Sequence, residues 1–201
     1  MISPTEAAAD AAIVILAGGK ASRLPGKLER EIGGEPLLVR VFERLGGRWP
    51  IAIAARGGFS PELDERLACP VLIDRWPDAG PLGALVSAAG ALRARRIFAV
   101  AGDLPLIERT ALERLEAAWM PEDEAVVYRH DGRLEPLAAL YDRAALVREG
   151  FALLREGTGA MHALLERLRS RAISGDDRWF LNVNTPEDLM RACAAPPKGT
   201  P

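Results

Sequence analysis

The stretch from Ala11 to Lys27, AAIVILAGGKASRLPGK, carries the strongest structural signal in the chain. Ala11 to Leu16 is a short, continuously apolar run, which predicts a buried strand. It leads directly into a loop that contains Gly18 and Gly19 and the basic residues Arg23 and Lys27. Glycines let backbone N–H groups approach and point at an anion, and basic side chains add positive charge. The stretch therefore predicts a polyphosphate-binding loop behind a buried strand.

Two familiar phosphate motifs do not fit this loop. A Walker A loop needs a glycine where Ala21 stands and a hydroxyl side chain where Leu28 stands. The dinucleotide fingerprint needs Gly-x-Gly-x-x-Gly, which Gly18-Gly19-Lys20 does not supply. A plain glycine turn is the alternative, but such a turn would not need Arg23 and Lys27. The loop is a different phosphate-binding device.

Lysine is rare in this chain, and two of its three positions, Lys20 and Lys27, lie in the loop, the third being Lys198. Elsewhere the basic side chains are arginines, apart from two histidines. A compact ammonium differs from the planar guanidinium fork, so we expect the loop to need the former. Chance placement is the alternative.

Composition narrows the class of protein. The chain has 201 residues, 49% of them hydrophobic, which predicts one domain over residues 11–194 with flexible ends at 1–10 and 195–201. Its well-mixed charges sum to -2, which argues against nucleic-acid or membrane-surface binding. No apolar run or leader-like N-terminus indicates membrane insertion or export, so we expect a cytoplasmic protein. Cys69 and Cys193 are isolated and predict neither a disulfide nor a zinc site.

Helix and strand signals alternate along the chain. We expect strands at 11–16, 51–55, 71–73, 97–101, 125–128, 137–141 and 180–183, and helices at 36–45, 80–92, 108–120, 143–150 and 161–169, with a last helix capped by Thr185. Apolar strands joined by helices predict an α/β fold, Rossmann-like, in which a mostly parallel sheet lies between two helical layers.

Candidate site residues follow these strands where ligands bind in such sheets, at the carboxyl ends. Asp103 follows the strand 97–101 and is placed to hold Mg²⁺, although it could instead cap the next turn. Asp74 follows the strand 71–73 and could accept hydrogen bonds from sugar hydroxyls or base amino groups, or cap its own turn. Three polar features, including the loop, therefore share one edge of the sheet.

Two further segments carry weaker signals. The helix start from Gly80 to Gly83 could let a ligand lie against backbone, although its small residues also suit close helix packing. Asn182 and Asn184 flank Val183 at the end of the strand expected at 180–183. Alternate positions on a strand face the same side, so both amides could hold one polar ligand. Asn184 could instead serve the turn before the last helix. His130 and His162 have no nucleophile nearby in the sequence and are expected to be structural or surface residues.

Taken in order, these motifs resemble those of the MobA-like nucleotidyltransferases over residues 13 to about 190. The segments that carry the resemblance are Leu16-Ala17-Gly18-Gly19 with Arg23 and Lys27, Asp74, Gly80-Pro81-Leu82-Gly83, Gly102-Asp103-Leu104-Pro105, Glu135-Pro136-Leu137 and Asn182 to Asp188. The loop from Gly19 to Lys27 is about two residues shorter than the usual family pattern. Its Leu-Ala-Gly-Gly form is similar to the branch of the family that uses GTP.

The resemblance implies a nucleotidyltransferase fold and a magnesium-dependent transfer of GMP from GTP to the terminal phosphate of molybdopterin. It implies that Leu16 to Gly19 meet the nucleotide, Lys27 its phosphates, Asp74 the guanosine and Asp103 the magnesium, with Asn182 and Asn184 on the acceptor side. It also implies transient contact with other molybdenum cofactor biosynthesis proteins or apo-molybdoenzymes. A related enzyme that uses CTP or a sugar phosphate, and a non-catalytic nucleotide-binding module, are the alternatives.

Overall fold

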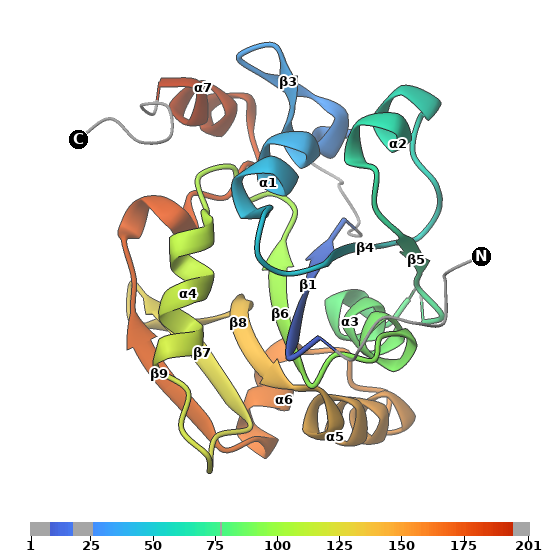
Figure 1. Ribbon diagram of the computed structural model, residues 1–201, viewed down its shortest axis with the longest axis vertical. Helices are drawn as coiled ribbons and strands as arrows, with labels where there is room; N and C mark the ends of the chain where they lie inside the picture. Colours follow the sequence, from blue (N-terminus) through green and yellow to red (C-terminus); the bar gives the residue numbers. More distant parts are fainter. Residues whose placement is uncertain (1–8, 18–25, 77, 195–201) are drawn as a thin grey trace.

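A computed structural model describes residues 9–17, 26–76 and 78–194 (Figure 1). Its centre is a seven-stranded sheet in the order β5-β4-β1-β6-β8-β7-β9. β8 is antiparallel to both of its neighbours, and the other described pairings in this sheet are parallel. The strands are β1 (Ala11–Leu16), β4 (Ile51–Ala55), β5 (Val71–Ile73), β6 (Arg96–Ala101), β7 (Ala125–His130), β8 (Arg133–Asp142) and β9 (Ser170–Ser174). The mostly parallel sheet is confirmed.

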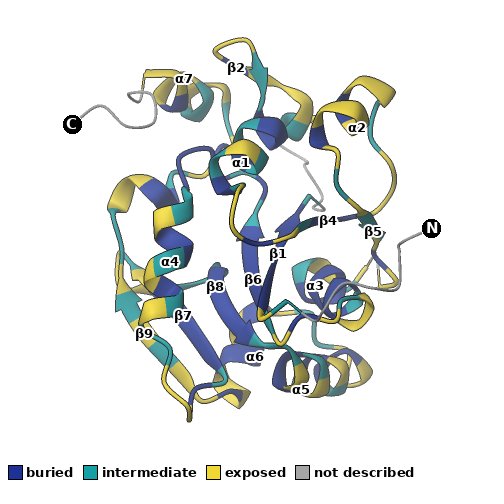
Figure 2. Cartoon of the chain, viewed as in Figure 1, coloured by how far each residue is buried: buried dark blue, intermediate teal, exposed yellow. Residues whose placement is uncertain are grey.

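Helices cover both faces of the sheet, and the alternation of side chains along β1 shows why. Ile13 and Ile15 point into one apolar core, whereas Val14 and Leu16 point into the other. The first core contains residues of α1 (Leu37–Leu45), α2 (Pro61–Leu67), α4 (Arg109–Ala117) and α7 (Pro186–Ala194), and the second contains residues of α3 (Gly80–Ala91), α5 (Arg143–Arg155) and α6 (Met161–Arg167). The central strands are accordingly buried (Figure 2). The three-layer α/β fold is confirmed.

The strand order reverses at β1. From β1 the chain passes through α1 to β4 on one side, and from β5 it passes through α3 to β6 on the other. The carboxyl ends of β1 and β6 therefore flank a topological switch point, the usual ligand position in such sheets. A small hairpin of β2 (Glu31–Ile32) and β3 (Glu35–Pro36) and the start of α7 lie at the same end of the molecule (Figure 1).

The expected strand at 180–183 is wrong. A 3-10 helix, η2 (Asp177–Phe180), and an irregular segment occupy this region. Its apolar residues are buried as a cap on the core, where Trp179 and Phe180 pack edge-on against Tyr128 at 5.7 and 5.4 Å. The last strand of the sheet is instead β9, which lies at the edge and pairs with β7 on one side. Because a strand at the edge of a sheet is not buried between two neighbours, its sequence can be polar. The sequence Ser-Arg-Ala-Ile-Ser accordingly gives little strand signal.

Two helices also differ from expectation. The helix expected to end at Gly150 continues to Arg155, because this glycine serves helix packing rather than termination. A Cβ at Gly150 would lie 2.4 Å from Val86 Cγ2, so the absence of a side chain lets α5 approach α3. Sequence patterning missed α2, which has only seven residues and is started by the Ser60 hydroxyl accepting from the Leu63 N–H.

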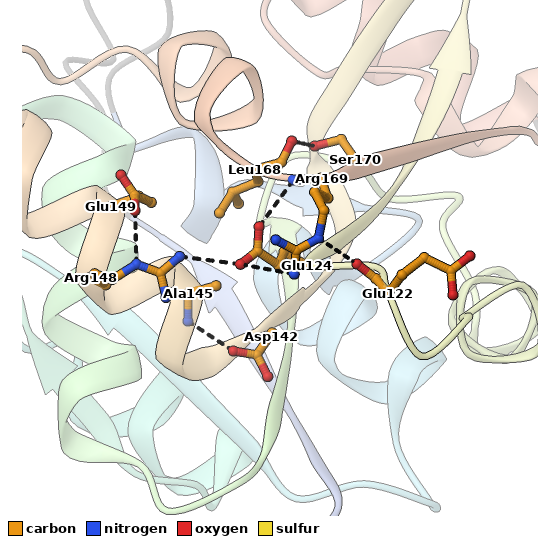
Figure 3. Close-up of polar contacts among 9 residues, drawn as sticks. All are labelled: Glu122, Glu124, Asp142, Ala145, Arg148, Glu149, Leu168, Arg169 and Ser170. Atoms are coloured by element: carbon orange, nitrogen blue, oxygen red, sulfur yellow. Dashed lines mark hydrogen bonds and ion pairs between the residues drawn. The ribbon is translucent and has the colours of Figure 1, made fainter.

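The amino ends of β7 and β9 are held by a polar network around Glu124 (Figure 3). Its carboxylate accepts hydrogen bonds from the Arg169 backbone N–H at 3.1 Å and from Arg148 Nη2 at 3.2 Å. Burial works to raise the pKa of Glu124, but these donated hydrogen bonds outweigh it and lower the pKa. Nearby, Asp142 caps α5 through the Ala145 N–H. This network ties α5 to the sheet at the edge opposite the switch point.

Other sequence expectations concern the ends of the chain and membranes. Residues 1–8 and 195–201, within the ends expected to be flexible, lie outside the described residues. The carbonyls of Ala9 and Asp10 accept backbone hydrogen bonds from Arg95 and Arg96. Within the described part of the chain, no helix has the length and apolar character needed to cross a membrane.

Gly83 is expected to be required for stability. A Cβ at this position would lie 2.6 Å from the Trp76 carbonyl oxygen, so Gly83→Ala must displace backbone. We expect a loss of about 1–3 kcal/mol in the free energy of unfolding, measured by chemical denaturation. Gly90→Ala, in the same helix but facing open space, is the matched control and should be neutral or slightly stabilising. Equal effects of the two substitutions would contradict this interpretation.

Candidate active site

Three side chains from distant parts of the sequence meet at the switch point. The ammonium of Lys27 lies 2.5 Å from Asp103 Oδ2 and donates a second hydrogen bond to Asn184 Oδ1 at 3.0 Å. The side chains of Lys27 and Asp103 are 18% and 19% exposed, so the pair is shielded yet accessible from solvent. The structure thus brings three of the expected site residues into direct contact around one cation.

Asp103 is positioned by the close approach of two strands. The backbone N–H of Gly102 donates to the Leu16 carbonyl at 3.0 Å, which continues the β1–β6 pairing beyond Ala101. A Cβ at Gly102 would lie 3.0 Å from that same carbonyl, so a side chain here would crowd the end of β1. Glycine before the aspartate therefore lets Asp103 stand directly beside the point where the glycine-rich loop begins.

Lys27 comes from the far end of that loop. It begins the 3-10 helix η1 (Lys27–Glu29), after Gly26, whose φ of +64° favours glycine. Gly18, Gly19 and Arg23 lie outside the described residues. Leu16 is buried, and the N–H of the half-buried Ala17 donates to the Ala54 carbonyl. Both ends of the loop are thereby anchored at the carboxyl edge of the sheet.

Asn184 reaches the cluster from the segment before α7. The backbone N–H of Val183 donates to the Asp103 carbonyl at 3.0 Å, so the two segments are joined through backbone as well as side chains. Asn182 is exposed and lies in irregular structure, not on a strand. The strand that was expected to point both amides the same way is therefore not formed by these residues. Among the described residues, Asn184 contacts the cluster and Asn182 shows no hydrogen bond to it.

Asp74 serves its own turn in this structure. It is buried, and its Oδ1 accepts from the Trp76 N–H at 2.8 Å and from the Ser87 hydroxyl at 3.4 Å. This is the turn-capping arrangement that the sequence left open. None of the hydrogen bonds seen among the described residues connects Asp74 with Lys27 or Asp103, although both aspartates follow parallel strands at the same sheet edge. The second oxygen of its carboxylate is not used by these contacts.

Gly80 marks the start of α3 and borders a cavity. Its φ of +65° lies in the left-handed region, where a side chain would be strained. The space above Gly83, by contrast, is filled by the Trp76 backbone rather than open to a ligand. A cavity of about 610 Å³ lies between the turn after β5 and the loop between α5 and α6, and its lining is Arg75, Trp76, Asp78, Ala79, Gly80, Leu154, Gly157, Thr158 and Gly159.

The Glu135-Pro136-Leu137 motif lies near the start of β8, where its register against β7 shifts. Because β8 is antiparallel to β6, its first residues lie at the edge where β6 ends. The Tyr141 hydroxyl donates to the Pro136 carbonyl at 2.8 Å and fixes this irregular stretch. Burial raises the pKa of Glu135. The motif therefore places the half-buried carboxyl group of Glu135 at the end of the sheet where β6 ends. This carboxyl group received no role in the sequence analysis.

A magnesium ion is compatible with the cluster. Oxygen atoms of Asp103 and Asn184 converge on one cation, the Lys27 ammonium, and carboxylate and amide oxygens are ligands that Mg²⁺ accepts. Within the described residues there is no group of three His, Cys, Asp or Glu side chains able to hold a metal. Magnesium in phosphate sites takes only one or two protein carboxylates, so a single aspartate suffices.

None of the contacts found for the two histidines and two cysteines within the described residues connects them with the Lys27 cluster. His130 stacks on Phe180 with ring centroids 4.7 Å apart and pairs with Asp177 at 3.1 Å. His162 lies exposed on α6. Cys69 and Cys193 are free thiols, and burial raises the pKa of Cys69 to about 11, which keeps it protonated near neutral pH.

Comparison with known proteins defines the class. The family described as MobA-like NTP transferase domain matches residues 13–173. A curated molybdenum cofactor guanylyltransferase from Cereibacter sphaeroides is 34% identical over 192 residues, covering 89% of this chain and 93% of the relative. One from Vibrio cholerae is 28% identical over 200 residues, covering 96% and 97%.

Solved structures of similar fold point to the same class of protein. Molybdopterin-guanine dinucleotide biosynthesis protein A from Archaeoglobus fulgidus has a TM-score of 0.74 and 25% identity, over 90% of this chain and 95% of its own. The 2-C-methyl-D-erythritol 4-phosphate cytidylyltransferase from Thermus thermophilus shares the fold, with a TM-score of 0.71 and 18% identity over 91% and 97%. The fold, the site and these relatives define a nucleotidyltransferase. The chain belongs to the MobA-like NTP transferase family.

Substitutions at Asp74 can separate turn formation from ligand binding. Asp74→Asn keeps an oxygen for the Trp76 N–H, so its free energy of unfolding should stay near that of the parent protein. Asp74→Ala removes that acceptor and should cost about 1–2 kcal/mol in chemical denaturation. If the carboxylate also binds nucleoside, both variants will weaken GTP binding in calorimetry. If Asp74→Asn binds GTP as tightly as the parent protein, the Asp74 carboxylate has a role in forming its turn and none in binding nucleoside.

Proposed function

We propose that this chain transfers GMP from GTP to the terminal phosphate of molybdopterin and releases pyrophosphate. The observation that carries the proposal is the Lys27 ammonium held against Asp103 beside the glycine-rich loop, at the switch point of the sheet. The choice of GTP and molybdopterin is supported by the relatives named molybdenum cofactor guanylyltransferase, which match this chain over most of its length.

The reaction needs two anions to be brought into line. A phosphate oxygen of the acceptor attacks the α-phosphorus of GTP, and the bond from that phosphorus to the bridging oxygen of pyrophosphate breaks. The acceptor phosphate is already ionised, so neither a protein nucleophile nor a strong base is required. The protein's task is to position both substrates and to stabilise developing negative charge, for which Lys27 and the backbone N–H groups of the loop are suited.

Asp103 is the residue proposed to hold Mg²⁺, with Asn184 beside it. A magnesium ion held there would neutralise charge on the leaving pyrophosphate. Because Lys27 already pairs with Asp103 Oδ2, the same carboxylate orients the ammonium and offers oxygen to the metal. The lysine and the proposed metal site therefore share the Asp103 carboxylate, so a change at either one affects the charge at the other.

The remaining expected residues take their proposed roles from the family resemblance. Leu16, Ala17, Gly18, Gly19 and Arg23 belong to the loop proposed to bind the nucleotide and its phosphates. Asp74 and Gly80, at the ends of neighbouring elements of the same sheet edge, are proposed for the guanosine side. Asn184, which belongs to the cluster, and Asn182 precede α7 and are proposed to meet the acceptor.

Nucleotide choice provides the direct test. Purified protein with molybdopterin and Mg²⁺ is incubated separately with GTP, CTP, UTP and ATP, and pyrophosphate release is followed. We expect release with GTP, together with formation of the guanine dinucleotide. Release with CTP alone, or only with a sugar phosphate as acceptor, would reassign the protein to another branch. GTP binding without release with any acceptor would indicate a non-catalytic module.

The cluster itself can be tested by substitution. Lys27→Ala should lower kcat about a hundredfold, the usual effect of removing one contact that stabilises transition-state charge. Asp103→Ala should abolish magnesium-dependent turnover while thermal unfolding shows an intact fold. Arg30→Ala removes one positive charge from an exposed position three residues beyond Lys27 and is the control for net charge. Full activity of the Asp103 variant would exclude its assignment as the metal residue.

A further inference from the structure

We propose that Asp188 is a positioning residue, which holds the Asn184 amide against the Lys27 ammonium. The proposal rests on the proposed function, because it assigns a role within that same site. In the sequence analysis Asp188 was named only as the end of the segment from Asn182 that carries the family resemblance, and it lies in the first turn of α7. Its contacts show that it acts on the segment before the helix as well.

One carboxylate oxygen accepts two backbone N–H groups. Asp188 Oδ2 lies 3.0 Å from the Asn184 nitrogen and 3.0 Å from the Thr185 nitrogen. The Thr185 hydroxyl in turn accepts from the Asp188 N–H at 3.2 Å, which completes a reciprocal cap. The hydrogen bond from the Asn184 backbone is foremost in lowering the pKa of Asp188, so the carboxylate is ionised at neutral pH.

These bonds restrain a residue that packing does not. Asn184 is exposed, so no surrounding core fixes its orientation. The preceding residue, Val183, is fully buried and its N–H donates to the Asp103 carbonyl. Asn184 is therefore held from both directions, by Val183 on the Asp103 segment and by Asp188 at its own N–H. This leaves the amide oxygen directed at Lys27 Nζ, 3.0 Å away.

The arrangement affects where the lysine charge sits. With Asn184 in place, the ammonium is shared between an anionic and a neutral oxygen. Without it, Asp103 is the single remaining partner among these three residues, and the charge is drawn toward that carboxylate. A phosphate must then compete for the Lys27 ammonium with an Asp103 carboxylate that holds it more closely. Asp188 thus acts on Lys27 through Asn184, without touching the substrate.

A double-mutant cycle separates positioning from simple helix stabilisation. We expect Asn184→Ala and Asp188→Ala each to lower kcat/KM for GTP about tenfold, as loss of a hydrogen bond to a charged group does. If Asp188 acts through Asn184, the double variant will also lose about tenfold rather than about a hundredfold. Asp188→Asn keeps an acceptor oxygen and should recover part of the loss.

Glu187→Ala is the matched control. Glu187 lies in the same first turn and carries the same charge, but it is exposed. Removing it changes the electrostatics of the helix start to the same degree and should leave kcat/KM unchanged. Thermal unfolding of every variant, with rates measured well below the lowest midpoint, keeps loss of folding apart from loss of positioning.

Failure of this proposal can be distinguished from failure of the proposed function. Additive losses in the cycle, or an unaffected Asp188→Ala variant, would overturn the positioning role even if GMP transfer is observed. If the parent protein transfers no GMP, the proposed function fails, and the same cycle is measured by calorimetry with Mg²⁺ and GTP. Non-additive losses in affinity would then support the positioning role, and additive losses would overturn it.

Discussion

The ion pair between Lys27 and Asp103 is the contact on which the rest of the site depends. It joins the two segments that leave the sheet at its switch point, one after β1 and one after β6. Backbone hydrogen bonds from Gly102 to the Leu16 carbonyl and from Val183 to the Asp103 carbonyl hold the carboxylate in place, and the Lys27 carbonyl accepts the Arg30 N–H at the other partner. The parallel pairing of β1 with β6 is therefore a requirement of the chemistry as well as of the fold.

Much of this fold could be predicted because its central strands are buried on both sides and their sequences are continuously apolar. Prediction failed where tertiary packing replaces local pattern. The apolar residues around Trp179 and Phe180 suggest a strand, yet they cap a core that Tyr128 also lines. Gly150 suggests a helix end, yet it allows α5 to approach α3. Neither outcome can be read from spacing alone, because each depends on a partner distant in sequence.

The candidate site, like the fold, could be predicted from the sequence only in part. Sequence order placed Asp74 and Asp103 at one sheet edge, because strand ends in a parallel sheet share that edge. It could not show that Lys27 and Asp103 touch across 76 positions, nor that Asp74 already satisfies its own turn. The contribution of Asp188 was also hidden, since an acidic residue in a first helical turn is commonplace. Only its contact with the Asn184 backbone distinguishes it.

The site also accounts for one of the three lysines in a chain whose other cationic side chains are mostly arginines. An ammonium carries three donors around one compact charge, whereas a guanidinium presents its donors in a fixed plane. Asp103 and Asn184, which lie on different segments, accept two of the hydrogen bonds that this ammonium can donate. Within the described parts of the chain these two oxygens are its hydrogen-bond partners, and we propose that the third donor binds a phosphate oxygen. An arginine would pair flat against the Asp103 carboxylate and could not converge on three separate oxygens at one point, so the geometry around Asp103 itself favours lysine at position 27.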